Sequence, residues 1–290
     1  MTVVHQSAPE LRRLLASLDA HLPVRPEVIV VDSGSSDDGA QIAREWGAIV
    51  VDLGENRGFG AASNAGVQRA SHDVTALLNP DVELLDGSLL TLVERARERD
   101  ALLAPRLLNA DGSTQRSAHP RPGRAQALIP ALIPPQMLPF AVRQRLEPHQ
   151  ATKPRHIGWA IAAALTARTR TLKQLGPFDP EAFLFYEDLD LCLRARAQGI
   201  PTELHPDTTL RHTGGHATQP AYRGEPHDLL ARRRREVIEA RLGKRARALD
   251  DAAQALTFAT RAAARHARRR DASRETAQLR ALLRARKRDP

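Results

Sequence analysis

Apolar residues follow two different spacings along the first 110 positions. Short apolar runs such as residues 27–31 and 74–78 have the length and the β-branched content of buried strands. Between such runs, apolar residues recur every three to four positions, as they do in residues 9–20. This alternation of strand and helix is typical of an α/β fold whose sheet is mostly parallel and flanked by helices.

The pattern predicts the elements of this part of the chain one by one. Strands are expected at 3–4, 27–31, 49–52 and 74–78, and helices at 9–20, 37–46, 60–70 and 89–99. Residues 119–154 contain eight prolines and little periodicity, which is typical of a long irregular loop. A further helix is expected from about Glu187 to Gln198, with Gly199 as its C-terminal cap.

Charge divides the chain in two. Residues 228–290 carry 19 Lys and Arg against 8 Asp and Glu, whereas the rest carries 24 against 26. We therefore expect an α/β domain at 1–220 and a basic extension at 221–290, whose Ala- and Arg-rich sequence favours helix. Such an extension is suited to the phosphates of an anionic membrane, or it is a solvated helical arm, and the pattern leaves both interpretations open.

Composition also narrows the class and the compartment. A nucleic-acid partner is not expected, because the α/β part is nearly neutral and aromatic residues make up only 3% of the chain. The one cysteine excludes an internal disulfide framework, and no run reaches the ~20 apolar residues of a spanning helix. Without a secretion signal in residues 1–9, we expect a cytoplasmic protein, with contact at the inner face of the plasma membrane through 228–290 left open.

Two polar segments follow predicted strands. Asp32 directly follows the strand at 27–31, at the sheet edge where α/β proteins bind ligands. A simple turn before a helix capped by Asp37 is an equal alternative. Residues 58–63 resemble a dinucleotide fingerprint, but Ser63 replaces the third glycine and residues 53–57 separate it from the strand, which disfavours a nicotinamide cofactor. Asn56, Arg57 and Asn64 supply polar groups for a base or a diphosphate instead.

The segment Asn79-Pro80-Asp81 ends another predicted strand. One carboxylate combined with substrate phosphates is a common way to hold Mg²⁺ or Mn²⁺, while an ordinary Asn-Pro-Asp turn is the structural alternative. The segment 211–216, which contains His212 and His216, is a candidate source of a metal ligand or a phosphate contact, and a hydrogen-bonded structural histidine is the competing interpretation.

Three acids stand among large apolar residues in the segment 185–192. Asp190 and Arg194 are four residues apart on a helix and can pair, which makes Asp190 structural. Asp188, near the positive end of the helix, is the better candidate for a general base. No serine has the context of a hydrolase nucleophile.

Taken together, these motifs resemble glycosyltransferase family 2, the inverting enzymes of GT-A fold, and within it the bacterial rhamnosyltransferase-like branch. The segments that carry the resemblance are 7–11, 30–35, 56–60, 79–81, 105–113, 176–179 and 185–192. The resemblance implies a nucleotide-binding half at 1–110 and an acceptor and catalytic half at 111–220 that contains the proline-rich loop. The sequence departs from the family pattern at His5-Gln6, where an aromatic residue and an asparagine are usual.

The resemblance also implies roles for single residues. Asp188 is expected to be the catalytic base beside Glu187, and Asp81 and His212 are expected to bind a divalent cation, Mg²⁺ or Mn²⁺. The residues expected to contact the nucleotide are Asp32, Ser35, Asn56, Arg57, Gly58, Asn64 and Asn79.

The implied activity is metal-assisted, inverting transfer of a sugar to a hydroxyl group of a cell-envelope glycan or a lipid-linked acceptor. dTDP-rhamnose is the favoured donor, with UDP-sugars second. A relative that binds a nucleotide-sugar without transferring it is the main alternative, and the presence of Asp81 and Asp188 argues against it. The sequence does not predict the oligomeric state.

Overall fold

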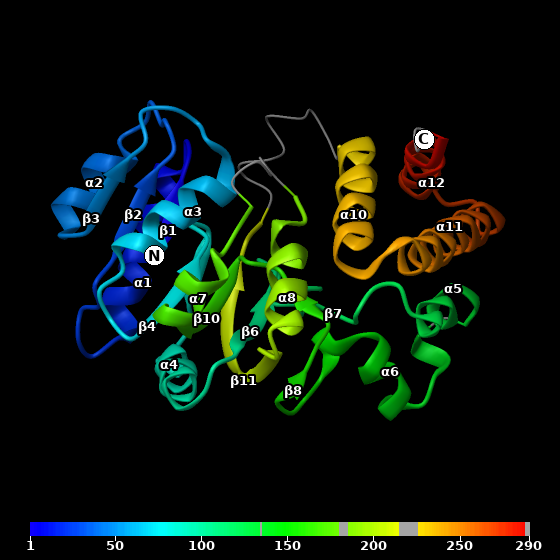
Figure 1. Ribbon diagram of the computed structural model, residues 1–290, viewed down its shortest axis with the longest axis horizontal. Coiled ribbons are helices and arrows are strands. Elements are labelled where there is room, and N and C mark those ends of the chain that lie inside the picture. The colour runs from blue at the N-terminus through cyan, green and yellow to red at the C-terminus, as the bar shows by residue number, and fades with distance from the viewer. Residues whose placement is uncertain (134, 180–184, 215–225, 288–290) are drawn as a thin grey trace. The chain divides into compact units, whose positions relative to one another are not determined.

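The computed structural model describes residues 1–133, 135–179, 185–214 and 226–287 (Figure 1). The described chain forms two compact units, one within 1–119 and 149–223, the other within 120–148 and 224–290. The proline-rich segment, expected in the first domain, thus belongs largely with the C-terminal helices. The expected domain boundary at residue 220 lies outside the described residues.

The first unit begins with a parallel three-stranded sheet. Its order is β1-β2-β3, formed by β1 (Thr2–Val4), β2 (Ile29–Asp32) and β3 (Ile49–Asp52). The N–H of Leu78, at the end of β4 (Val74–Leu78), donates to the carbonyl of Met1 over 3.0 Å. This bond places β4 beside the first strand, so that the parallel strands continue into a second sheet.

The second sheet is mixed. Its order is β4-β10-β6-β11-β5, and its further strands are β5 (Val82–Leu84), β6 (Leu102–Leu108), β10 (Ala164–Arg168) and β11 (Thr202–His212), with β8 (Arg155–His156) also paired to β11. Strands β6 and β11 are parallel, whereas the other pairs in this sheet are antiparallel. A separate small pair joins β7 (Ala118–His119) to β9 (Trp159–Ala160).

Helices cover both faces of the sheet. Val28 and Val30 belong to the core shared with α1 (Ala8–His21), α2 (Gly39–Trp46) and α4 (Ser88–Glu98), as the alternation of side chains along a strand requires. Ile29 and Val31 point the other way, toward α3 (Gly58–Arg69). Helix α3 contacts α7 (Thr169–Leu175), which in turn contacts α8 (Glu187–Ala197).

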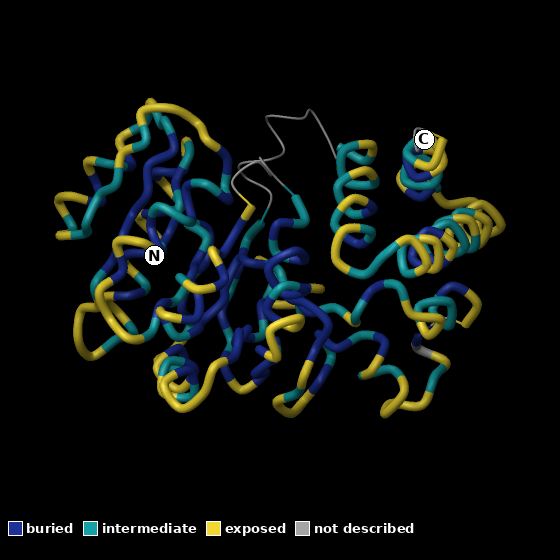
Figure 2. The backbone as a smooth tube through the Cα atoms, in the orientation of Figure 1, coloured by how far each residue is buried: buried dark blue, intermediate teal, exposed yellow. Residues whose placement is uncertain are grey.

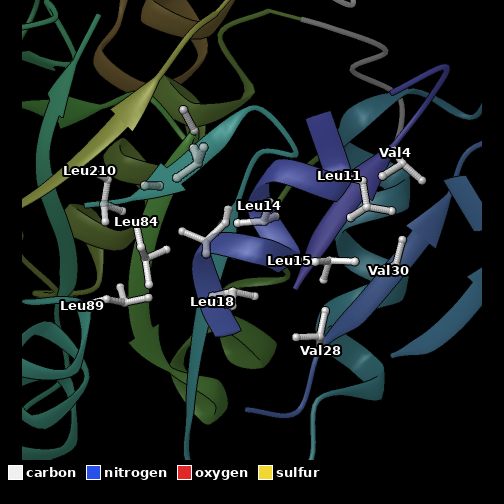
Figure 3. Packing of buried hydrophobic residues seen from close by; sticks show 14 of the residues in the cluster. Val4, Leu11, Leu14, Leu15, Leu18, Val28, Val30, Leu84, Leu89 and Leu210 are labelled. Carbon is white, nitrogen blue, oxygen red and sulfur yellow. The ribbon is translucent and has the colours of Figure 1, made fainter. Parts of the chain in front are cut away.

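Helix α1 anchors the larger core. Figure 3 shows its leucines directed toward Val28 and Val30 on one side and toward Leu84 and Leu210 on the other. Leu14 is 1% exposed, and full burial of such a side chain stabilises the fold by about 1.5–3 kcal/mol. The parallel and the mixed strands therefore share one core, whose strands are mostly buried in Figure 2.

The second unit is helical, as the sequence predicts for its C-terminal part. It contains η1 (Ala125–Leu128), α5 (Ile129–Leu132), η2 (Pro135–Met137), α6 (Phe140–Leu146), α10 (His227–Leu242), α11 (Lys244–Ala267) and α12 (Ser273–Lys287), and η3 (Pro148–Gln150) follows α6. Arg234 of α10 makes two hydrogen bonds of 2.8 Å to the carboxylate of Asp250 in α11. None of the described helices has both the length and the apolar character needed to cross a membrane.

Candidate active site

The turn after β2 is held tightly against the loop after β3. The Asp32 carboxylate, 6% exposed, accepts a hydrogen bond from the N–H of Ser35 over 2.9 Å. Between these residues Gly34 has φ = +69°, and a Cβ there would lie 2.8 Å from the backbone nitrogen of Asn56. Only glycine fits this position, and its close approach brings Asp32 and Asn56 to the same edge of the sheet.

Asn56 organises the start of α3. Its side-chain oxygen accepts hydrogen bonds from the Gly58 N–H over 3.0 Å and from the Ser33 hydroxyl over 3.4 Å. The Ser33 hydroxyl accepts in turn from the N–H of Arg57 over 3.2 Å. These bonds place the sequence-predicted residues Asn56, Arg57 and Gly58 beside Asp32, at the carboxyl ends of parallel strands where α/β folds bind ligands.

Asn64 lies elsewhere in the structure. Its amide nitrogen donates to the carbonyl of Phe178 over 2.8 Å, and its amide oxygen accepts from the Phe178 N–H over 3.0 Å. Phe178, in the turn that follows α7, also contacts α3 through its ring, whose centroid lies 5.4 Å from that of Phe59. The side chain of Asn64 therefore joins α3 to this turn, and we do not assign it to the nucleotide.

Asp81, directly before β5, and His212, the last residue of β11, form a pair. Each residue is 8% exposed, and the Asp81 Oδ1 lies 3.3 Å from the His212 Nε2. The other Asp81 oxygen accepts a hydrogen bond from the Gly214 N–H over 2.8 Å. Burial alone would raise the pKa of Asp81, but the interactions with His212 and Gly214 outweigh it and hold that pKa below its usual value. Asp81 is therefore a carboxylate at neutral pH.

Gln115 orients the histidine ring. The His212 Nδ1 lies 2.8 Å from the Gln115 side-chain oxygen, which can only accept, so Nδ1 carries the proton. The His212 Nε2 thus faces the Asp81 carboxylate, and a divalent cation bound there would take the place of the Nε2 proton. An oriented imidazole with a carboxylate is a donor set that such cations accept.

The turn at Asn79 fixes the backbone before Asp81. The Asn79 N–H donates to the carbonyl of Ala163 over 2.8 Å, and its own carbonyl accepts from the Val82 N–H over 3.2 Å. No group of three or more potential metal ligands is present among the described residues. A cation at Asp81 and His212 would therefore take its remaining ligands from substrate and water.

Glu187 and Asp188 begin helix α8. Glu187 is 9% exposed and Asp188 is partly buried. The preceding Phe185 and Tyr186 have φ values of +75° and +62°, a conformation that costs about 1–3 kcal/mol for a residue with a side chain. The Tyr186 ring lies 6.1 Å from that of Trp159, which stacks on His119 at 4.0 Å. The entry into α8 is thus held in a strained geometry beside an aromatic stack.

Asp190 is structural, as the sequence predicts. Its carboxylate accepts a hydrogen bond from the Arg194 Nε over 2.7 Å, and the side chains are only 8% and 16% exposed. Arg194 also donates to the carbonyls of Leu175 and Pro177. The pair thereby ties α8 to the end of α7.

Replacing Asp190 with asparagine is expected to destabilise the protein. Loss of one partner from a largely buried ion pair costs about 3–5 kcal/mol, because the remaining charge stays out of water. Urea denaturation measures this change, with Glu94→Gln as control because Glu94 also pairs with an arginine of its own helix, Arg97 three residues on, but at the surface. Equal unfolding midpoints for both variants would contradict the structural role of Asp190.

One backbone segment connects the two groups of acids. The carbonyl of Ala163 accepts from Asn79, and that of Ala160 accepts from the Cys192 thiol of α8 over 3.9 Å. Burial raises the pKa of this thiol to about 12, so it does not act as a nucleophile. The Asn79 turn and helix α8 therefore flank the same four residues.

The sequence did not indicate Gln115 and Trp159. Gln115 acts on a histidine 97 positions away, and Trp159 acts on a residue 27 positions away, so no local pattern marks either of them. The only signal was the position of Gln115 just after the segment 105–113, which carries part of the family resemblance.

The strand order, the carboxylates at strand ends and the acidic start of α8 define the fold and the class. The fold is the GT-A fold of glycosyltransferases. Residues 1–157 match the family described as Glycosyl transferase family 2, and the chain belongs to this family. The predictions of a family 2 glycosyltransferase with GT-A fold are confirmed.

A curated relative narrows the branch. The chain is 29% identical over 238 residues to an N-acetylglucosaminyl-diphospho-decaprenol L-rhamnosyltransferase of Mycobacterium tuberculosis, covering 75% of this chain and 76% of the relative. Within the family, the chain is thus similar to a rhamnosyltransferase over three quarters of its length.

Solved structures support the fold. A mannosyltransferase from Pyrobaculum calidifontis, solved in complex with GDP-Man and Mn²⁺, aligns with a TM-score of 0.58 at 16% identity, over 98% of this chain and 84% of that one. GalNAc-T7 with UDP, GalNAc and Mn²⁺ aligns with a TM-score of 0.60 at 18% identity, over 82% of this chain but only 47% of the other. At such identities the likeness concerns the fold alone.

Proposed function

We propose that this protein transfers a rhamnose-like sugar from a nucleoside-diphosphate donor to a hydroxyl group of a cell-envelope glycan or a lipid-linked acceptor. The observation that carries the proposal is the Asp81–His212 pair, oriented by Gln115, next to the segment that also supports α8. This pair and the acids of α8 supply the two functions that the transfer needs, which are control of the diphosphate and removal of the acceptor proton.

The nucleotide would bind at the ends of β2 and β3. Asp32 would accept hydrogen bonds from the base or the ribose, and Asn56 and Arg57 would line the same place. The backbone of Ser35 and Gly58 and the side chain of Asn79 complete the proposed contacts. Arg57 is 58% exposed and pairs with Glu55, an arrangement that leaves it able to turn toward a phosphate.

Asp81 and His212 would hold a divalent cation, Mg²⁺ or Mn²⁺. When bound, such a cation neutralises charge on the diphosphate leaving group. The chain itself contributes the orientation of both ligands, since Gln115 holds the His212 ring and the Gly214 N–H holds the second Asp81 oxygen.

Asp188 would take the proton from the acceptor hydroxyl, with Glu187 beside it as the second acid of the catalytic pair. The acceptor oxygen then attacks the anomeric carbon from the side opposite the nucleotide, and the bond to the diphosphate breaks. One direct displacement inverts the anomeric centre. Both acids lie in the first turn of α8, at the positive end of the helix dipole.

The donor is tested by titrating nucleotide-sugars in the presence of Mn²⁺ and measuring the melting temperature. dTDP-rhamnose is expected to stabilise most, because the 29%-identical relative is named an L-rhamnosyltransferase. A ligand at about 100 times its Kd stabilises a folded protein by about 2.7 kcal/mol. Stronger stabilisation by UDP-sugars would overturn the donor assignment, and binding without transfer to any acceptor would indicate the silent relative.

A further inference from the structure

The second unit exposes an unusual cluster of large apolar side chains. Nine such side chains are exposed in the described residues, and five of them fall within residues 132–142. They are Leu132 (67% exposed), Ile133 (43%), Met137 (75%), Phe140 (61%) and Val142 (37%). Single exposed apolar residues are normal at a protein surface, but five within eleven positions are not.

The backbone keeps these side chains outward. Short elements broken by prolines carry them: the end of α5, the turn η2 and the start of α6. The inner side of the segment is occupied, since Ala131 and Leu146 are buried and α5 packs on α11. The five exposed side chains therefore do not belong to the core of this unit.

The segment is attached to a basic helix. Gly123 has φ = +71°, and a Cβ there would lie 2.6 Å from that of Ala246, so the chain touches the first turn of α11. Arg124, next to this contact, is exposed, as are Lys244 and Arg245 beside Ala246. Arg145 of α6 is also exposed. Exposed cationic side chains thus occur both before and after residues 132–142 in the chain.

The charge of the whole unit has the same sign. The two stretches that form it, 120–148 and 224–290, contain 23 Lys and Arg against 10 Asp and Glu, a net charge of +13. The remaining stretches contain 20 against 24, a net charge of −4. Exposed apolar side chains in a strongly cationic unit suit a surface that combines acyl chains with anionic headgroups.

We propose that the exposed side chains of Leu132, Ile133, Met137, Phe140 and Val142, here called the apolar segment, insert into the interfacial layer of an anionic lipid membrane while arginines and lysines of the same unit bind its headgroups. The contact with the acyl chains is thereby assigned to the proline-rich stretch, and the basic helices α10, α11 and α12 supply electrostatic attraction to the headgroups. Lipid binding is a property separate from the proposed sugar transfer, and it is measured without donor or acceptor.

The test is co-sedimentation of the full chain with vesicles of phosphatidylglycerol and phosphatidylcholine in equal parts. The double variant Met137→Glu with Phe140→Glu is expected to lower the bound-to-free ratio at least about tenfold, because two apolar anchors become charged. The matched control is Val24→Glu with Leu90→Glu, which adds the same charge at the two large apolar residues exposed among the described residues of the other unit, and it is expected to bind as the unchanged protein does.

A second measurement separates insertion from charge attraction. The fluorescence of the tryptophan introduced by Phe140→Trp is expected to be quenched by vesicles that contain brominated lipid, whereas a purely electrostatic contact leaves this fluorescence unchanged. Absence of vesicle binding, equal losses in the two double variants, or unquenched emission would each overturn the proposal. So would a change from dimer to monomer in the Met137→Glu, Phe140→Glu variant, because the patch would then cover a second copy of the chain.

Discussion

Replacement of Asp188 by asparagine is expected to lower kcat by about 10²- to 10⁴-fold, the contribution of a positioned general base. The amide keeps the shape of the carboxylate but cannot take the proton of the acceptor hydroxyl. Because Asp188 lies at the start of α8 and the nucleotide residues lie after β2 and β3, donor affinity is expected to stay unchanged. Initial rates and a nucleotide titration of the same preparation give both values.

Two controls define this experiment. Glu45→Gln removes an exposed carboxylate from α2 and is expected to retain full activity. The melting temperature of the Asp188→Asn variant is expected to match that of the unchanged protein, since Asp188 is only partly buried. Activity of Asp188→Asn close to normal would remove Asp188 from the role of base.

Replacement of Asp81 by alanine is expected to weaken donor binding in the presence of Mn²⁺ at least about tenfold, and to leave binding without metal nearly unchanged. The variant removes the carboxylate that lies 3.3 Å from the His212 Nε2. Gln115→Ala is expected to act in the same direction but less strongly, because the His212 ring loses its orienting partner. Calorimetry with and without Mn²⁺ measures both effects.

The control for the metal experiment is Glu98→Ala, which removes an exposed carboxylate at the end of α4. Its donor affinity is expected to respond to Mn²⁺ as that of the unchanged protein does. If Asp81→Ala kept the full Mn²⁺ response, the cation would bind at other residues, and the Asp81–His212 pair would be a structural ion pair.

Most of the first half of the fold could be predicted from the sequence because its pattern is local. The expected strands at 49–52 and 74–78 agree with β3 and β4 at both ends, and the helix expected at 9–20 is α1 with slightly wider bounds. Each of these elements has a short apolar run or an apolar face, and that local pattern alone predicts the element.

Strand β11 could not be predicted in the same way. Its buried positions include Glu203 and His205, which read as surface residues until their partners are known. Arg99 pairs with Glu203, and the His205 Nε2 lies 3.0 Å from the same carboxylate. The register also shifts between His205 and Thr209, where Pro206 interrupts the ladder.

The contacts of the site residues also differ in whether a local pattern predicts them. The pair of Asp190 with Arg194 was predictable, because four residues on a helix fix their contact. The bonds of Asn64 to Phe178 were not, because 114 positions separate the two residues and the asparagine follows a glycine-rich segment that suggests a ligand. Local spacing predicts which residues share an element, whereas partners that come from distant elements need the folded chain.

The most direct test of the account is a crystal structure of the protein with Mn²⁺ and an intact, non-transferable nucleotide-sugar. The account predicts that Asp81 and His212 both ligate the cation together with the diphosphate, and that the Asp188 carboxylate faces the side of the anomeric carbon opposite the nucleotide. A cation bound away from Asp81 and His212, or an anomeric carbon turned away from Asp188, would contradict it.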